Sequence, residues 1–300
     1  MATVQTWPAL NSPEWPATQA TLHMWSQVVG KVQLALAPRV NHWWSSALHV
    51  TSSGIATDLM HHPNGAFSIA FDFVNHELQV LTVDGRRRSV PLHPQTVADF
   101  YARVMETLAG LDLAVKIWPM PVEIPSPIRC DRDIEHKSYD RDAANAFWRI
   151  LVDVSGVFME FRARFLGKAT TPLFWWGSFD LAITRFSGRR APERPGADAV
   201  TREAYSHEVI SAGFWPGSGA MTEAAFYAYA APEPEGFKGA RVQPPSAYYS
   251  PDFNEFFVKY EDVRRSASPR DTLLAFLQST YEAGATLGAW DRQALERAER

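Results

Sequence analysis

The stretch FSIAFDFVNHELQVLTVDGRRRSVPL (67–92) alternates apolar and polar side chains over three consecutive segments. In the first segment, 67–74, a large apolar residue stands at every second position, which is typical of a strand with one buried face. Asp84-Gly85 is a hairpin turn signal between the second and third segments. The stretch therefore predicts three antiparallel strands, at 67–74, 77–83 and 87–92.

Helices and further strands are predicted on both sides of this stretch. Residues 17–36 place Leu22, Trp25 and Val29 on one face at helical spacing. Residues 94–110 form a second expected helix, with a proline near its start and a glycine just past its end. Strands are also predicted at 42–50 and 112–118.

The second half of the chain repeats this order. Asp140 is placed to cap a helix over 142–167, and Ser268 to cap a closing helix over 269–285. Between these helices, the predicted strands cover 173–186, 205–213, 224–230 and 255–260. Each half thus consists of a helix, four strands and a helix, which predicts an α+β fold with mainly antiparallel, curved sheets.

Two short motifs recur in both halves and favour an internal duplication. A Gly-Lys pair stands at 30–31 and again at 167–168, and a Trp-Trp pair follows at 43–44 and again at 175–176. Chance similarity between two α+β halves is the alternative. The expected organisation is an N-terminal half (1–118), a Pro-rich linker (119–140) and a C-terminal half (141–300), either separate or joined in one compact unit.

The composition argues against several classes of protein. The 300 residues carry a net charge of −4 with a pI of about 6.1, and no basic cluster points to nucleic acid. Cys130 is the only cysteine, which rules out a disulfide within the chain and the cysteine-based zinc motifs. No run of about 18 apolar residues predicts a membrane span. No secretion signal opens the chain, so we expect a cytoplasmic protein.

The segment AYSHEVISAGFWPG (204–217) begins like the HExxH motif of zinc proteases. Position 211 is Ser instead of the second His, and the flanking β-branched residues favour a strand rather than the helix that the motif needs. On a strand, His207 and Glu208 point to opposite faces and do not share a metal. A zinc protease is therefore not expected. His207 stays a candidate acid/base or ligand, with a hydrogen-bonded structural histidine as the alternative.

A metal site would have to be assembled from distant segments, because no two histidines have the spacing HxH or HxxxH. His23, His42 and His207 are the candidate ligands for such a site. The sequence identifies no cofactor.

The strand predicted at 173–186 has two different faces. Arg185 lies on its apolar face and Arg189 follows in a Ser-Gly turn, where an arginine needs a carboxylate of the protein or an anionic ligand. The other face carries Trp176 and Asp180 among small residues, which suits a pocket wall or a half-exposed sheet face. Further candidate lining residues are Trp43, Tyr205, Trp215 and Tyr227.

These residues favour an enzyme that acts on a small-molecule ligand in an aromatic-lined pocket. His207 is the expected acid/base or ligand, with His23 as its helper and Glu208 as a further catalytic candidate. An arginine is expected to hold an anionic group of the ligand. The alternative is a non-catalytic ligand-binding or assembly protein that uses the same aromatic groove, so the sequence leaves open whether the chain is an enzyme.

Several strings together resemble a bacterial family known as a domain of unknown function. They are TLHMWSQVVGK (21–31), NHWW (41–44), FDFVNHEL (71–78), SFDLAITRFSGRRAP (178–192), AYSHEVISAGFWPG (204–217), FYAYAAPEP (226–234) and WDRQALE (290–296). The resemblance spans nearly the whole chain but implies no established activity. In that family a His stands shortly before the Phe-Trp-Gly stretch. Leu173 stands at that position here, which argues against a metal site relying on it.

Overall fold

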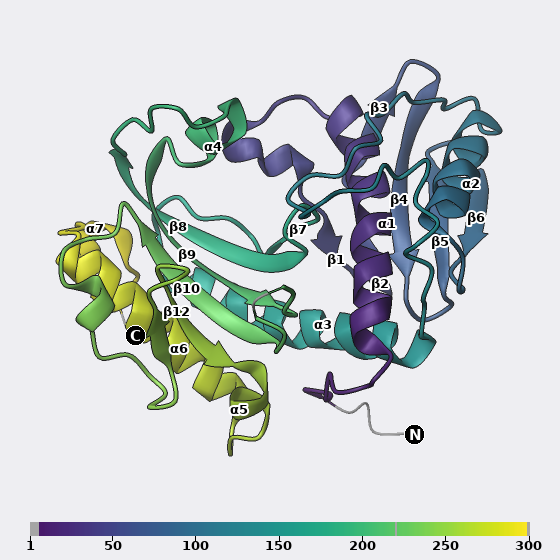
Figure 1. Ribbon diagram of the computed structural model, residues 1–300. Coiled ribbons are helices and arrows are strands. Elements are labelled where there is room, and N and C mark those ends of the chain that lie inside the picture. The colour runs from purple at the N-terminus through teal and green to yellow at the C-terminus, as the bar shows by residue number, and fades with distance from the viewer. Residues whose placement is uncertain (1–5, 220, 299–300) are drawn as a thin grey trace.

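The structure is a computed structural model that describes residues 6–219 and 221–298, and it has an α+β fold with two antiparallel sheets (Figure 1). The first sheet has the order β1-β2-β4-β5-β6, with β3 paired to β4, and the second has the order β11-β12-β10-β9-β8-β7. The first-sheet strands are β1 (His49–Val50), β2 (Gly54–Ala56), β3 (Met60–His62), β4 (Gly65–Asp72), β5 (Glu77–Thr82) and β6 (Arg87–Pro91). The second-sheet strands are β7 (Leu173–Trp175), β8 (Asp180–Arg190), β9 (His207–Trp215), β10 (Ala225–Ala231), β11 (Tyr248–Ser250) and β12 (Glu255–Lys259).

Three of the longer helices begin at a residue whose side chain caps them. Thr96, Asp140 and Ser268 accept hydrogen bonds from backbone N–H groups in the first turns of α2, α3 and α6. The α-helices are α1 (Trp15–Leu36), α2 (Val97–Ala109), α3 (Arg141–Ala163), α4 (Ala199–Ala204), α5 (Tyr260–Arg264), α6 (Pro269–Leu287) and α7 (Arg292–Leu295). Two 3₁₀ helices, η1 (Asn41–Ser46) and η2 (Phe237–Gly239), complete the set.

Helix α1 lies between the two sheets and contacts both halves of the chain (Figure 1). On one side Trp25 stacks on Phe100 of α2, at 4.7 Å between ring centroids. On the other side Gly30 packs directly against the Trp176 ring of the second half. Gln27 is fully buried and donates to the carbonyl of Val122, while its own carbonyl accepts from the Val122 N–H. One contiguous cluster of buried apolar side chains runs through both halves.

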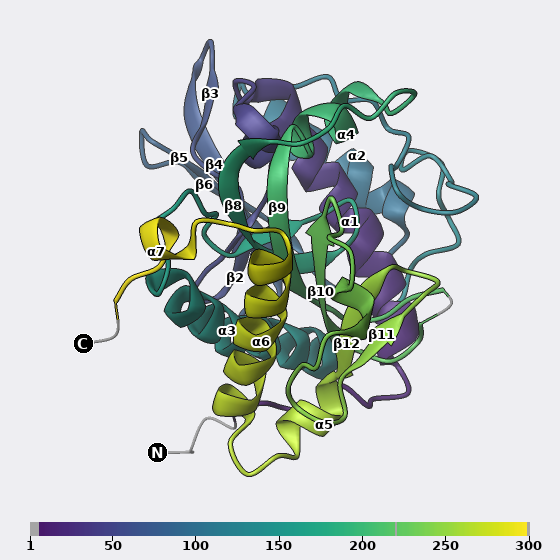
Figure 2. The same ribbon diagram turned by 90° about the vertical axis from the view of Figure 1, so that its left-hand side faces the viewer.

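Helices α3 and α6 cover one face of the second sheet, as Figure 2 shows. The residues that point toward these helices include Leu181, Ile183 and Phe214, all almost completely buried. Among the described residues, no helix of comparable length lies against the opposite face of β8, β9 and β10. This open face carries the candidate site.

Two predicted strands do not form. Residues 42–50 were expected to be extended, but His42 (φ 57°) and Trp43 (φ 62°) are left-handed and belong to η1, so only His49–Val50 pairs. Residues 112–118 alternate in sequence but have no strand partner, and Asp112 has a φ of 61°. The strand predicted at 173–186 is two strands, β7 and β8, joined by a turn in which Phe179 has a φ of 61°.

Candidate functional site

The open face of the second sheet is lined by alternate residues of three neighbouring strands. Thr184 of β8 lies opposite Ser211 of β9, which lies opposite Tyr229 of β10. Gly213 lies between Ala182 and Tyr227 in the same way, and a side chain at Gly213 would overlap the Tyr227 ring. We call this surface the tyrosine face. It comprises Asp180, Ala182, Thr184, Phe186, Val209, Ser211, Gly213, Trp215, Tyr227 and Tyr229.

Asp180 is the most deeply placed ionisable group on the tyrosine face. Its side chain accepts hydrogen bonds from Ser178 Oγ, at 2.6 Å, and from the Tyr227 hydroxyl. The residue is 5% exposed, and among the described residues no Lys, Arg or His forms an ion pair with it. Burial raises the pKa of Asp180 to about 6, although both hydrogen bonds act in the opposite direction.

The tyrosines of this face are reachable by solvent yet surrounded by protein. Tyr205 and Tyr229 share a hydroxyl–hydroxyl hydrogen bond of 2.9 Å, and the Tyr227 and Tyr229 rings stack at 6.2 Å. All three residues are only half-buried. Burial nevertheless raises the pKa of Tyr227 and Tyr229 well above 10. These tyrosines therefore present partly exposed rings and hydroxyl groups beside Asp180.

A second carboxyl group lies near Asp180. Burial, and then the charge of Asp180, raise the pKa of Glu255 on β12 to about 7. The charge of Glu255 in turn contributes to the raised pKa of Tyr205, Tyr227 and Tyr229. This end of the face therefore holds two carboxyl groups that titrate near neutral pH, a feature common at functional sites.

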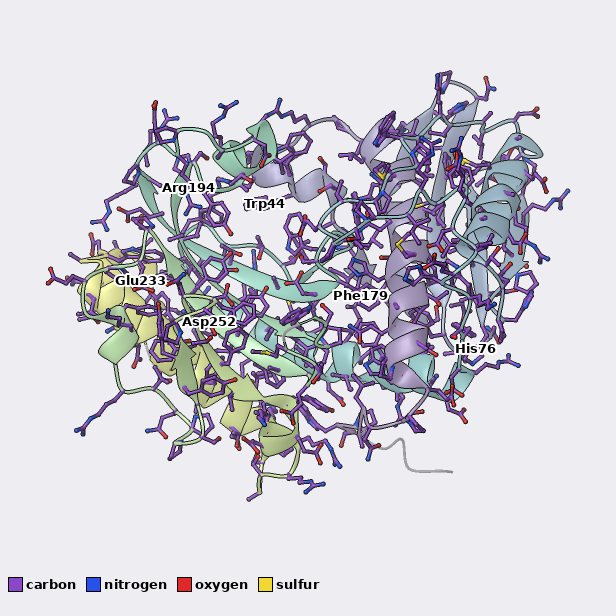
Figure 3. All side chains as sticks on the ribbon, in the orientation of Figure 1. Trp44, His76, Phe179, Arg194, Glu233 and Asp252 are labelled. Carbon is purple, nitrogen blue, oxygen red and sulfur yellow. The ribbon has the colours of Figure 1, made fainter. Side chains whose placement is uncertain are left out.

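Cationic groups gather at the other end of the tyrosine face. Lys168 Nζ lies 2.6 Å from His42 Nε2, and the His42 and His207 ring centroids are 5.6 Å apart. The Lys168 ammonium also lies over the Phe186 and Trp44 rings, at 4.8 and 5.1 Å. Phe186 joins this end to Tyr205 and Tyr229 through one apolar cluster. Figure 3 labels Trp44 and Arg194, which lie above β8 and β9 in that view.

Arg185 does not lie on the tyrosine face. It is 1% exposed and packs under α3 and α6, where its guanidinium lies over the Phe161 and Tyr281 rings and donates to the Phe161 carbonyl. Burial lowers its pKa to about 9. Aromatic rings, the Phe161 carbonyl and the charge of Glu296 surround this guanidinium without a direct ion pair among the described residues, so Arg185 serves the core.

Arg189 and Glu208 pair with each other on the side of β9 that faces away from His207. Their ion pair measures 2.7 Å, and Glu208 also accepts from Ser187 Oγ. Arg189 further donates to the carbonyls of Gly288 and Ala289. The strand parity predicted for His207 and Glu208 is thus confirmed, and it separates Glu208 from the candidate site.

His23 and Trp176 hold α1 against the second half. His23 Nε2 lies 2.8 Å from the Gly177 carbonyl and its ring stacks on Phe179. Trp176 is 6% exposed and donates from Nε1 to the Ser46 carbonyl. Trp43 stacks under the Arg39 guanidinium, at 4.6 Å, and Trp215 contacts Phe253 edge-on.

The three histidines proposed as metal ligands do not come together, because His42 and His207 are neighbours while His23 binds the Gly177 carbonyl. Within residues 6–219 and 221–298, no group of three or more His, Cys, Asp or Glu side chains is placed to hold a metal ion.

Two hollows lie elsewhere on the molecule. One of about 580 Å³ is lined by Thr96 and Asp140, which cap α2 and α3. The other, of about 520 Å³, lies at the junction of the halves, where His49 and Asp58 form an ion pair of 3.0 Å. Thr96, Asp140, His49 and Asp58 have partners within the protein, whereas Asp180 has no cationic partner among the described residues.

Sequence reasoning missed Lys168, Trp44, Phe186 and Glu255 as members of this surface. The sequence contains features that point to two of them. Phe186 shares the strand parity of Asp180, and Trp44 belongs to the repeated Trp-Trp motif. Lys168 also belongs to a repeated motif, but its partner His42 lies 126 residues away in the chain.

Residues 7–297 match the family of unknown function DUF5996, and the chain belongs to that family. No curated protein and no solved structure matches the chain. In the part of the chain that the structure describes, no helix is both long and apolar enough to cross a membrane.

Proposed function

We propose that the chain binds a small organic molecule on the tyrosine face and acts on it as an enzyme, by acid–base chemistry at Asp180. The main support is the state of the Asp180 carboxyl group. It is nearly buried, held by Ser178 and Tyr227, and has no cationic side chain beside it among the described residues. A buried carboxylate that serves only the fold is normally paired with a cation.

The chemistry follows from the pKa of about 6 for Asp180, because such a group is available in both protonation states near neutral pH. The ionised carboxylate accepts the Tyr227 proton as a hydrogen bond and takes a proton from the ligand as a general base. The rate of a step that needs this base rises with pH through about 6 and levels off above it.

His207, the acid/base group expected from the sequence, has a different role in this proposal. It lies beside His42 at the cationic end, six residues along β9 from Gly213, which lies opposite Tyr227. Six strand residues span about 20 Å. We therefore assign proton transfer to Asp180 and ligand binding to the histidine end.

A binding screen followed by an activity screen tests the proposal. Wild-type protein, Asp180→Asn and Tyr227→Phe are compared by thermal shift against a library of small metabolites, and each ligand found is then assayed for turnover. Glu208→Gln is the matched control, since that carboxylate lies on the other side of β9 and pairs with Arg189.

We expect Asp180→Asn to reduce turnover by at least about 100-fold, the usual contribution of general base catalysis, with Glu208→Gln close to wild type. Ligands that bind through Asp180 and Tyr227 but are never turned over would favour the non-catalytic binding protein instead. Ligand binding and turnover that both variants leave unchanged would show that the proposed site is wrong.

A further inference from the structure

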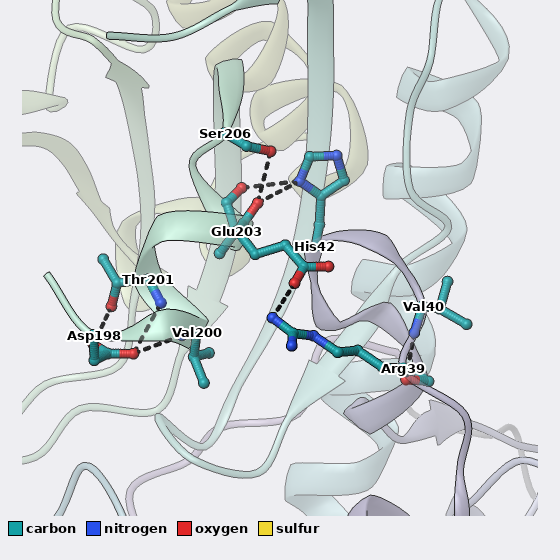
Figure 4. A network of polar contacts seen from close by, with 10 residues as sticks. Arg39, Val40, His42, Asp198, Val200, Thr201, Glu203 and Ser206 are labelled. Carbon is teal, nitrogen blue, oxygen red and sulfur yellow. Dashed lines mark hydrogen bonds and ion pairs between the residues drawn. The ribbon is translucent and has the colours of Figure 1, made fainter. Parts of the chain in front are cut away.

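At the cationic end of the tyrosine face, three basic side chains have no carboxylate partner among the described residues. Lys168 and His207 lie next to the fully partnered His42, and Arg190 lies opposite His207 in the β8–β9 pairing. None of these three forms an ion pair with a carboxylate within the described residues. The carboxylate of Glu203, whose backbone carbonyl contacts His42, is paired with Arg39 (Figure 4). This end therefore lacks an anion.

The backbone fixes the tautomer of His42. Its Nδ1 lies 3.0 and 3.1 Å from the carbonyls of Glu203 and Ala204, and since carbonyl oxygens only accept, Nδ1 carries the proton (Figure 4). Neutral His42 then presents a lone pair at Nε2, which accepts one proton of the Lys168 ammonium. Lys168 is exposed, and its other two N–H donors make no hydrogen bond to the described residues.

Backbone strain supports a functional role for this arrangement. His42 and Trp43 are consecutive residues with left-handed φ values of 57° and 62°. Such a conformation costs about 1–2 kcal/mol for each residue with a side chain. The strain is held by contacts with α4, and it points the His42 ring at Lys168. The two residues place the His42 ring next to Lys168 and the Trp43 ring next to Arg39.

The basic groups at this end repel one another when they are protonated. Burial, followed by the charges of Lys168 and Arg190, lowers the pKa of His207, and burial and Lys168 lower the pKa of His42. Burial also lowers the pKa of Lys168. An anion placed among these groups would relieve their repulsion, so its binding favours the protonated forms of Lys168 and His207, while His42 stays neutral as the acceptor of the Lys168 proton.

We infer that Lys168 and His207, oriented by His42 beside Trp44 and Phe186, bind an oxyanion of the ligand, either a carboxylate or a phosphate monoester. This inference names the class of ligand for the proposed function. It rests on the proposed function for where the remaining part of the ligand lies. The body of the ligand lies along the tyrosine face toward Asp180. Because that end is about 20 Å away, the ligand that reaches both is an elongated anionic molecule.

Titration calorimetry with three probes tests the site: inorganic phosphate, acetate and phenyl phosphate. The proteins are wild type, Lys168→Met, His207→Gln and the control Lys116→Met, which removes an exposed lysine of the segment 112–118. Each charge-assisted hydrogen bond lost should weaken binding by about 10- to 100-fold, while Lys116→Met stays within about twofold. Runs in buffers with different ionisation enthalpies should show proton uptake, with affinity rising from about pH 8 to about pH 5.5.

Each outcome decides a point. Phosphate binding without acetate binding identifies a phosphate ester, and the reverse identifies a carboxylate. Equal losses in Lys168→Met and Lys116→Met, or the absence of binding for every probe, would overturn the anion site. Asp180→Asn should leave phosphate binding unchanged. If phosphate binds as expected but Asp180→Asn also keeps wild-type turnover, the acid–base proposal is refuted and the anion site stands.

Discussion

Two lysine–tryptophan pairs connect the halves of the molecule with the same chemistry and opposite surroundings. Lys31 of the first half lies over Trp176 of the second, at 5.6 Å from its ring centroid. Lys168 of the second half lies over Trp44 of the first, at 5.1 Å. Each lysine belongs to a repeated Gly-Lys motif and each ring to a repeated Trp-Trp motif. This reciprocal exchange is what an internal duplication would produce, and the duplication itself stays a prediction.

The two pairs differ in access. Lys31 and Trp176 are each 6% exposed, and burial lowers the pKa of Lys31. Trp44, in contrast, is half-buried and Lys168 is exposed, with His42 as its hydrogen-bond acceptor. An amine over an indole ring is therefore not a functional signal in itself. The buried pair Lys31–Trp176, the closed pair, belongs to the core. The accessible pair Lys168–Trp44, the open pair, is available to a ligand.

The largest expected contrast is in stability. Trp176→Ala removes a buried ring and the hydrogen bond to the Ser46 carbonyl, and should lower the free energy of unfolding by about 3–5 kcal/mol. Trp44→Ala removes a half-buried ring and should cost about 1 kcal/mol. Urea unfolding followed by circular dichroism measures both. Equal losses would mean that the open pair is as much a part of the core as the closed one.

Gly30→Ala tests how tightly the closed pair is packed. A methyl group on Gly30 would overlap the Trp176 ring, so the substitution should lower the free energy of unfolding by about 1–3 kcal/mol despite the better helix propensity of alanine. Gly156→Ala in α3 is the matched control. No atom would approach a methyl group there, and the stability should rise by about 0.5–1 kcal/mol. A stabilised Gly30→Ala protein would show that α1 and Trp176 are loosely packed.

Strand parity was sufficient to predict much of this architecture. The first-sheet strands β4, β5 and β6 form where alternation predicted them, because one face of Phe67, Ile69 and Phe71 is buried under α1 and α2. The same parity placed Asp180 and Tyr227 on one face. Alternation alone was not sufficient at 112–118, where no neighbouring strand is available to pair.

Long-range contacts determine the conformation of residues 41–44 and the partners of the two arginines, which the local sequence pattern does not show. The left-handed conformation of His42 depends on carbonyls of α4 more than 160 residues away, so NHWW looked like the start of a strand. For Arg185 and Arg189, sequence leaves open a carboxylate of the protein or an anionic ligand, because it does not show that aromatic rings surround the first and that Glu208 pairs with the second. Sequence thus gave the faces of the strands, whereas the partners of individual cations came from the tertiary structure.

The pH dependence of stability separates the two lysines. The folded-state pKa of Lys31 is lowered, so between that value and 10.5 the unfolded chain binds more protons, and stability rises with pH. Lys31→Met has no such group. Wild type should therefore gain stability relative to Lys31→Met as pH approaches 10.5, measured by denaturant midpoints. Lys168→Met should show a weaker dependence, because Lys168 is exposed. A flat difference for Lys31 would mean that its amine reaches solvent.

The smallest effect is the coupling between Lys168 and Trp44. A double-mutant cycle with Lys168→Met and Trp44→Leu should give a coupling of about 0.5 kcal/mol, because an exposed cation–π contact is weak and Phe186 offers the ammonium a second ring at 4.8 Å. With saturating phosphate the coupling to the indole should fall further, since the same ammonium then binds the anion. A coupling that grows with phosphate would instead show that the ring and the anion bind the ammonium together, which makes Trp44 part of the anion site rather than its neighbour.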